Sequence, residues 1–407
     1  MKKQSSPGRR RFLQTLMAGT AAALSAPGLA RAHARRPFRI GLLLPRTSLC
    51  PQLGENLMRG VRLQLEMQGG SLAERPIDLV PEEFGTTPGQ AVTKASRLLE
   101  LQRVDLLIGP LSSAAVERLA PLLQSHRVPL LVTGPGANTV RPEERTPTIF
   151  HNTLHHWQGN FALGAWAARH LGLNGAMLTS IYDSGFDHLY AFEAGVLSVG
   201  GRVETIVTDA TPGEHRLTET LDALQAAKPE FIHLLHSDLL ATHLVRQLQA
   251  SGTSVPVIGS DLAITSREFT SRGPTLPDLK VATSWTPHLP TIANRDFVQL
   301  YRHRYRSDPD AFAMLGYEST QLLEQALQHV AGGSSLQQAL ATVSVEGPRG
   351  KVRMGAEQQS IQAPLYLFDT VSERVLTELT PVTEEHEAIR QLHAGPRTGW
   401  LTDYLRV

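Results

Sequence analysis

The sequence is poor in the features that would indicate a disulfide-bonded protein or a hydrolase. A single cysteine, Cys50, stands among 407 residues, so no disulfide can form within the chain and its stability must come from packing. Cys50 has no partner readable from the sequence that would activate it as a nucleophile. The G-x-S-x-G, H-E-x-x-H and paired-carboxylate motifs are absent. We therefore expect a protein that is not an enzyme and has neither catalytic residues nor a cofactor.

The sequence also lacks an excess of basic residues beyond its first segment. Residues 1–34 hold six of the 39 Lys and Arg residues and none of the 38 Asp and Glu residues, which leaves 33 basic against 38 acidic residues. This balance gives no reason to expect nucleic acid or an anionic membrane as a partner. No later apolar run is long enough to cross a bilayer, so we expect no membrane span. The remaining length is typical of two domains.

The first 34 residues have the features of an export signal. Basic residues precede the alanine-rich run 16–24, and small-residue cleavage patterns end at Ala32 and Ala34. The sequence RRRFL from Arg9 matches the core of a twin-arginine signal, which directs export of folded proteins. We expect cleavage after Ala32 or Ala34 and a periplasmic location.

Residues 104–136 form the most informative stretch of the chain. The apolar run 104–108 ends at a Gly-Pro pair, a helical pattern follows, and a second apolar run occupies 128–132. This is the pattern of a parallel βαβ unit whose strands are buried on both faces. Ser112 and Ser113 stand where the strand gives way to the helix, so they are candidates to bind an anionic group. The alternative is that either serine only caps the helix.

The same alternation of strand and helix recurs in two series. The first occupies residues 39–132, and the second occupies 156–258. Two amphipathic helical patterns, 295–305 and 312–329, follow the second series. Two α/β lobes with additional late elements fit this order better than one continuous sheet.

Six segments in this order resemble a known family. They are IGLLLPRTSLCPQLGENLMRGVRLQLE, RPIDLVPEEFGTTPGQAVTKASRLLE, VDLLIGPLSSAAV, NRDFVQLYRHRYRSDPDAFAMLGYESTQLLEQAL, and the closing pair GPRGKVRM and APLYLFD. Over nearly its whole length the chain after the signal is similar to type I periplasmic substrate-binding proteins of the branched-chain amino acid (Leu/Ile/Val)-binding family. These proteins are the receptor subunits of ABC importers.

The resemblance implies an α/β fold of two doubly wound, Rossmann-like lobes joined by three crossovers that act as a hinge. It predicts lobe 1 from residues 37–153 plus 285–363 and lobe 2 from residues 154–284 plus 364–381. Residues 382–407 lie beyond the regular pattern and are left unassigned.

The resemblance also implies residues that bind the charged groups of a ligand. The loop with Ser112 and Ser113 would hold a carboxylate, with Ser113 at the position of the family's serine. In the next loop Thr133, Ala137 and Asn138 are expected at the site, although Ala137 replaces a residue that bears a hydroxyl in the family. Asp261 falls on the acidic position that holds an ammonium group.

The aromatic wall of the family site is not retained. Its three positions fall on Leu53, Ser184 and Ser237, and His236, at the end of a strand, is a further candidate to line the cleft. The change argues against leucine, isoleucine or valine as the ligand. A larger or more polar compound that carries a carboxylate fits better.

Other residues have simpler interpretations. His155, His156, His233 and His236 match no standard zinc spacing, so we expect no metal site. Trp285 is assigned equally to packing near the second crossover and to the pocket wall. The expected role of Asp183 and Asp187 is that of solvated loop charges.

These observations predict a monomeric periplasmic receptor that binds a small carboxylate-bearing ligand between its lobes. Its partners would be the membrane permease subunits of an ABC importer. The alternative is a ligand-sensing periplasmic regulator with the same fold and no role in transport, because a fold alone does not fix a function.

Overall fold

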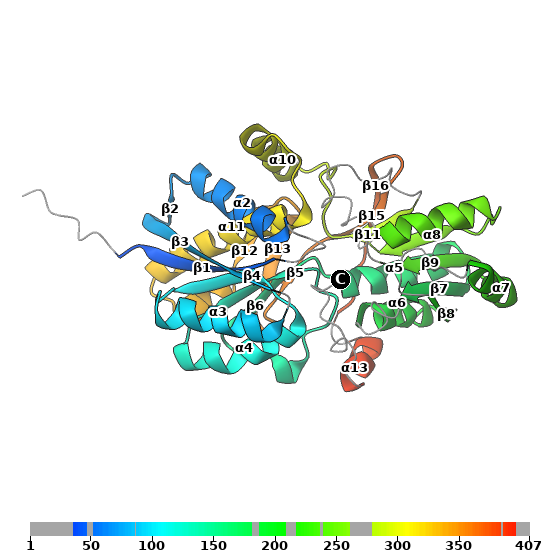
Figure 1. Ribbon diagram of the computed structural model, residues 1–407, viewed down its shortest axis with the longest axis horizontal. Helices are drawn as coiled ribbons and strands as arrows, with labels where there is room; N and C mark the ends of the chain where they lie inside the picture. Colours follow the sequence, from blue (N-terminus) through cyan, green and yellow to red (C-terminus); the bar gives the residue numbers. More distant parts are fainter. Residues whose placement is uncertain are drawn as a thin grey trace, which may run out of the picture. The chain divides into compact units, whose positions relative to one another are not determined.

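Two sheets, each flanked by helices, make up the chain in the computed structural model (Figure 1). The structure describes residues 36–46, 52–85, 87–180, 187–208, 217–236, 239–260, 279–383 and 386–395. Residues Phe38–Val407 form one compact unit. None of the helices in these ranges is long and apolar enough to cross a membrane.

The first sheet is built mainly from the N-terminal half of the chain, with three late strands at one edge. In the described residues its strand order is β12-β13-β14-β6-β5-β4-β1-β3-β2, and β3, β1, β4, β5 and β6 run parallel to one another. The strands are β1 (Phe38–Pro45), β2 (Ser71–Leu72), β3 (Arg75–Phe84), β4 (Leu106–Pro110), β5 (Leu130–Gly134), β6 (Ile149–Thr153), β12 (Ser344–Gly347), β13 (Gly350–Gly355) and β14 (Ser360–Gln362).

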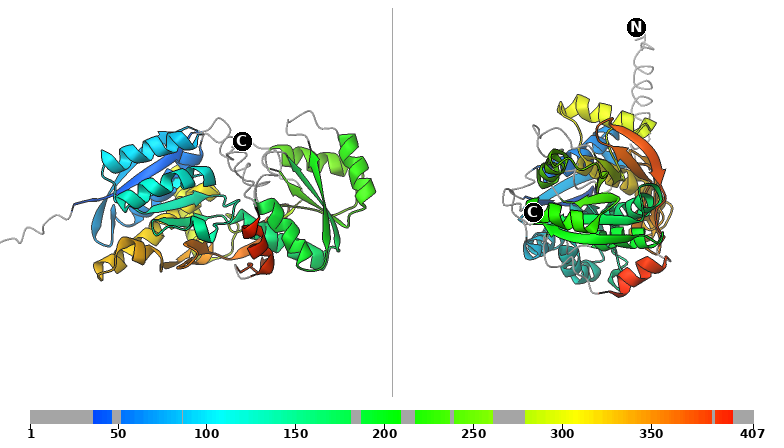
Figure 2. Two further views of the ribbon diagram at one scale, coloured as in Figure 1. Left: turned by 90° about the horizontal axis from the view of Figure 1, so that it is seen from below. Right: turned by 90° about the vertical axis from the view of Figure 1, so that its right-hand side faces the viewer.

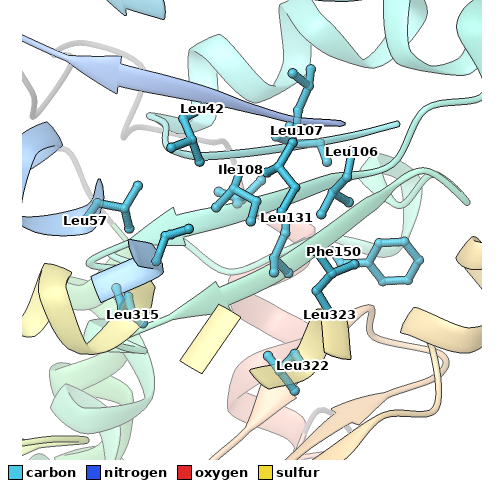
Figure 3. Packing of buried hydrophobic residues seen from close by; sticks show 14 of the residues in the cluster. Leu42, Leu57, Leu106, Leu107, Ile108, Leu131, Phe150, Leu315, Leu322 and Leu323 are labelled. Carbon is cyan, nitrogen blue, oxygen red and sulfur yellow. The ribbon is translucent and has the colours of Figure 1, made fainter. Parts of the chain in front are cut away.

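Helices cover both faces of this sheet, which is why its central strands are apolar throughout. All five residues of β4 and of β5 are buried, as expected for parallel strands enclosed on both sides. Helices α2 (Leu53–Met67) and α11 (Ala311–Ala331) pack together, as do α3 (Pro88–Glu100) and α4 (Ser113–His126) (Figure 1). Figure 3 shows Leu315, Leu322 and Leu323 of α11 close to the leucine and isoleucine side chains of the strands.

The second sheet has the order β16-β15-β11-β10-β9-β7-β8 in the described residues. Two separate apolar clusters cover its faces, one with α5 and α6 and the other with α7 and α8 (Figure 2). The elements are α5 (His156–His170), β7 (Asn174–Ser180), α6 (Asp187–Leu197), β8 (Arg202–Thr208), α7 (Leu217–Ala227), β9 (Phe231–Leu235), α8 (Leu239–Ala250), β10 (Val257–Ser260), β11 (Lys280–Thr283), β15 (Leu365–Asp369) and β16 (Arg374–Leu379).

The chain passes between the sheets after β6, after β11 and after β14. One buried residue contacts the chain at all three passages, through its side chain at two of them and its backbone carbonyl at the third. The guanidinium of Arg349, in the turn between β12 and β13, donates to the carbonyl of Thr153 (2.7 Å) and to the hydroxyl of Ser284 (3.4 Å). The hydroxyl of Tyr366 donates to the Arg349 carbonyl (2.9 Å), and Glu318 of α11 pairs with the guanidinium. We call these five residues the Arg349 cluster.

The expected fold class, two mixed α/β units with parallel strands and flanking helices, is confirmed. The late elements α10 (Ile292–Tyr305) and α11 lie close to the helical patterns expected for them, and α12 (Leu336–Leu340) follows. Trp285 is buried and donates its indole N–H to Asn294 (2.8 Å), so it packs in the apolar core that surrounds the first sheet.

The C-terminal segment, which the sequence left unassigned, contains a helix. Helix α13 (Glu387–Ala394) is strongly amphipathic and buries Ile389 in a cluster with Trp157 and Phe161 of α5. The guanidinium of Arg141 donates to the carbonyl of Gly395 (2.8 Å) and so satisfies a backbone group at the end of the helix. This helix was missed because it is short and lies outside the alternating pattern.

Helices α2 and α11 cross so closely that a glycine is needed at the crossing, which leads to a prediction about stability. A Cβ at Gly316 of α11 would lie 2.2 Å from the carbonyl oxygen of Leu57, so Gly316→Ala must push α11 away from α2. We expect it to lower the free energy of unfolding by ~2 kcal/mol. The control is Gly89→Ala at an exposed position of α3, where nothing lies within 4 Å of the added Cβ. This variant should raise the free energy of unfolding by up to ~1 kcal/mol. Urea unfolding of both variants measures the difference, and equal effects would contradict the close crossing.

Candidate ligand-binding site

A cavity of about 410 Å³ lies at the carboxyl ends of β5 and β6. Val132, Ile149 and His151 belong to these strands and line it, together with Val116 and other residues of α4. The loop between β5 and β6 contributes residues 136–140, Glu143, Glu144 and Thr146. The cavity therefore occupies the edge where ligands of parallel α/β sheets bind.

The two serines before α4 have different roles. Ser112 is the N-cap of the helix: its hydroxyl accepts from the backbone N–H of Ala115 (3.3 Å), and the residue is buried. Ser113 is the first helical residue and lines the cavity. Its hydroxyl accepts from the side-chain amide of Asn138 (3.0 Å), and no described residue accepts the Ser113 hydroxyl proton. Ser113 can therefore donate to a ligand.

The loop after β5 brings the other expected residues of lobe 1 to the same cavity. Thr133, Ala137 and Asn138 all line it with Ser113. The Thr133 hydroxyl is buried and has no hydrogen-bond partner in the described part of the chain. The carbonyl of Ala137 accepts from the backbone N–H of His188 in α6 (2.9 Å). Ser113 and three residues of the 133–138 segment thus meet in one cavity.

The start of α6 fixes this loop. Asp187 accepts from both the backbone N–H (2.9 Å) and the hydroxyl (2.8 Å) of Thr139, and its own N–H donates to Asn138 (3.0 Å). The expectation of a solvated loop charge at Asp187 is wrong, because the residue is buried. A buried carboxylate needs such donors to replace water. The loop that carries Ala137 and Asn138 is therefore held by α6, a helix of the second sheet.

Leu53 and His236, two other expected residues, do not line this cavity. Leu53 begins α2 and is buried in the core of the first sheet. His236 follows β9, where its Nε2 lies 3.2 Å from the Thr208 hydroxyl. Ser184, Ser237 and Asp261 lie outside the described residues, as do Cys50 and Asp183.

The cavity also contains residues that sequence reasoning did not assign to it. His151, Thr153, His155, Trp157 and Ser360 line its end near the first passage between the sheets. His155 was considered only as a metal ligand, and no sequence signal indicated its position in a pocket. Ser360 arrives from a strand more than 200 residues away, so only the pairing of β14 with β6 brings it there.

The histidines of the site are uncharged at neutral pH. Burial lowers the pKa of His151 to about 4. Burial, reinforced by the positive charge of Arg349, lowers the pKa of His155 to about 3. The cavity lining has no Lys or Arg among the described residues, while Glu117, Glu143 and Glu144 stand exposed around it. Within the described residues, no group of three or more His, Cys, Asp or Glu is placed to hold a metal ion.

Comparison with known proteins identifies the class. Residues 37–374 match the model of the periplasmic binding protein family. The chain belongs to this family. The resemblance to type I periplasmic binding proteins, including those for branched-chain amino acids, is thereby confirmed. A comparison with curated proteins finds no match.

Solved structures of such receptors share the fold. A solute-binding protein of R. palustris in complex with benzoate is 24% identical, with a TM-score of 0.71 over 87% of this chain and 99% of that chain. A substrate-binding protein of Sphaerobacter thermophilus is 24% identical, with a TM-score of 0.73 over 85% and 97%. A branched-chain amino acid-binding protein of Streptococcus pneumoniae in complex with isoleucine is 16% identical, with a TM-score of 0.67 over 85% and 100%.

The histidines with lowered pKa values predict that the protein loses stability in mild acid. The folded-state pKa values of His151, His155 and His233 all lie below 6.5, so the unfolded chain binds more protons once the pH falls below about 6.5. Burial raises the pKa of Asp310 to about 6. Near pH 5 the folded protein therefore binds about one proton more at Asp310 than the unfolded chain does, which offsets the effect of one histidine. Near pH 5 we expect a loss of about 2.7 kcal/mol per pH unit.

Urea unfolding at pH 7.5, 6.5, 5.5 and 5.0 measures this slope. His155→Asn removes one of the three histidines and should make the slope shallower by about 1.4 kcal/mol per pH unit. Stability that does not change between pH 7.5 and 5.0 would contradict the uncharged state of these side chains.

Proposed function

We propose that this protein captures a small carboxylate-bearing solute, an amino acid or a related acid, and delivers it to the permease subunits of an ABC importer. The observation that carries the proposal is the cavity beside the start of α4, with Ser113 and Asn138 at its polar end. Its volume of about 410 Å³ is typical of sites for small molecules.

The start of α4 suits a carboxylate. The first N–H groups of a helix have no partner within the helix, and the helix dipole favours a negative charge there. Because Ser112 caps the helix from outside the cavity, Ser113 is the residue that can donate its hydroxyl to the ligand. The exposed Glu117, Glu143 and Glu144 would favour an ammonium group on the same ligand at the cavity rim.

The apolar part of the lining suits a body larger than that of leucine. Leu111, Val116, Val132 and Ile149 line the cavity. Relatives with the same fold are described in complex with benzoate and with 3,4-dihydroxybenzoic acid. An aromatic acid combines a carboxylate with an apolar ring, so we propose this class ahead of the branched-chain amino acids.

We further propose that residues 1–34 are an export signal of the twin-arginine type and that the mature receptor acts as a periplasmic monomer. The arginine cluster beginning at Arg9 and the cleavage patterns at Ala32 and Ala34 support the export step.

The two serines offer a matched test of the carboxylate site. Ser113→Ala removes a donor to the ligand and should weaken binding about tenfold or more, with little effect on stability. Ser112→Ala removes the N-cap and should lower stability by ~1 kcal/mol while the affinity stays near that of the wild type. Calorimetry and urea unfolding of both variants measure the two effects with benzoate as the ligand.

A thermal-shift screen of carboxylic acids and amino acids provides the wider test. We expect an aromatic or otherwise bulky acid to raise the melting temperature most, because a ligand stabilises only the folded state that binds it. Leucine or valine as the best ligand would contradict the proposed class. Failure of every carboxylate to shift the melting temperature would contradict the carboxylate site.

A further inference from the structure

His155 is a buried side chain for which the described residues provide no structural role. It lies at the first passage between the sheets and is 5% exposed. The backbone of Ile361 lies close enough to the imidazole to raise its pKa slightly, but neither ring nitrogen makes a hydrogen bond of normal geometry to a described residue. Buried polar groups are nearly always paired, so at least one nitrogen of His155 is left for a partner that is not part of the described chain.

The backbone fixes the position of His155. Its φ of +55° lies in the left-handed region, which is uncommon for residues other than glycine. Neighbouring backbone groups hold this conformation: the N–H groups of Leu154, His156 and Trp157 donate to the carbonyls of Gly134, Pro135 and Gly136. The imidazole is therefore presented by a rigid frame.

Two cavities meet at this imidazole. His155, Trp157 and Ser360 line both the ligand cavity and a second cavity of about 420 Å³. The second cavity contains only uncharged residues among the described ones, with three glutamine side chains and the hydroxyl of Thr383. A charged group would find no counter-charge at this end.

The chemistry of an uncharged imidazole selects its partner. One nitrogen carries a proton and donates, while the other accepts. A hydroxyl can accept from the first nitrogen or donate to the second, whereas a second carboxylate offers only acceptors. An alkyl or unsubstituted aromatic edge would leave the histidine unpaired.

We propose that His155 hydrogen-bonds an uncharged hydroxyl group of the solute and thereby makes the receptor selective for hydroxylated acids. The inference rests on the carboxylate-binding function proposed above. It assigns the residue that hydrogen-bonds the end of the ligand opposite the carboxylate. A site built to pair with a hydroxyl rejects an analogue that lacks it, because its own polar group is then left unpaired.

The test compares acids that differ by one group. Calorimetry with 4-hydroxybenzoate, 3-hydroxybenzoate, benzoate and 4-fluorobenzoate should show that the wild type binds at least one hydroxybenzoate tenfold or more tighter than benzoate. 4-Fluorobenzoate should bind like benzoate, because fluorine cannot donate a hydrogen bond.

Two variants connect the preference to His155. His155→Leu should reduce the preference to less than threefold by weakening the hydroxybenzoate alone. His155→Asn should retain most of it, because asparagine has a donor and an acceptor and tolerates the left-handed conformation. If His155→Leu does not fold, His155→Gly decides the question, because glycine removes the imidazole and adopts the left-handed conformation without strain, so the preference should be lost there too.

The outcomes distinguish this inference from the function on which it rests. Equal binding of benzoate and both hydroxybenzoates by the wild type overturns the role of His155 and leaves the carboxylate site intact. A preference that persists in His155→Leu overturns it as well. If the wild type binds none of the four acids, the aromatic-acid class and the hydroxyl inference both fail.

Discussion

The buried ion pair of Arg349 and Glu318 is the interaction on which the arrangement of the chain passages depends. Both side chains are fully buried, and the guanidinium approaches the carboxylate at 2.5 Å and 3.2 Å. The same guanidinium contacts Thr153 and Ser284, and the Arg349 carbonyl accepts from Tyr366. Charges removed from water need several such partners, so the residues of the Arg349 cluster must adopt their positions together.

The Arg349 cluster also determines where the ligand-binding site lies. Thr153 is the last residue of β6, and His155 follows it two residues later. The carbonyl contact at Thr153 therefore fixes the segment that presents His155 to the cavity. The positive charge of Arg349 contributes to the low pKa of His155, so the same contact helps to keep the imidazole uncharged. Packing, charge and ligand recognition are thus connected through one side chain.

The sequence was sufficient for the parts of the fold that depend on periodic patterns. Residues 104–136 predicted a strand, helix and strand, and the structure contains β4, α4 and β5 there. The choice between cap and ligand residue for Ser112 and Ser113 could not be made, because a shift of one residue separates the two roles. In the fold, Ser112 caps the helix while Ser113 lines the cavity.

Other features depend on contacts that no local pattern records. Asp187 was expected to be solvated because it lies near a loop, yet it is buried through bonds to Thr139, 48 residues away. The left-handed conformation of His155 and the approach of Ser360 arise from tertiary structure alone. Such residues are concentrated at the site, where side chains must bind a ligand as well as stabilise the fold.

A double-mutant cycle on the ion pair tests the central role of the Arg349 cluster most directly. Urea unfolding should show that Arg349→Met and Glu318→Met each lower stability by about 3–5 kcal/mol, because each leaves one buried charge unpaired. The double variant should be less destabilised than the two single losses combined, by at least about 2 kcal/mol, since it removes both charges. Strictly additive losses, or a single variant as stable as the wild type, would contradict the account.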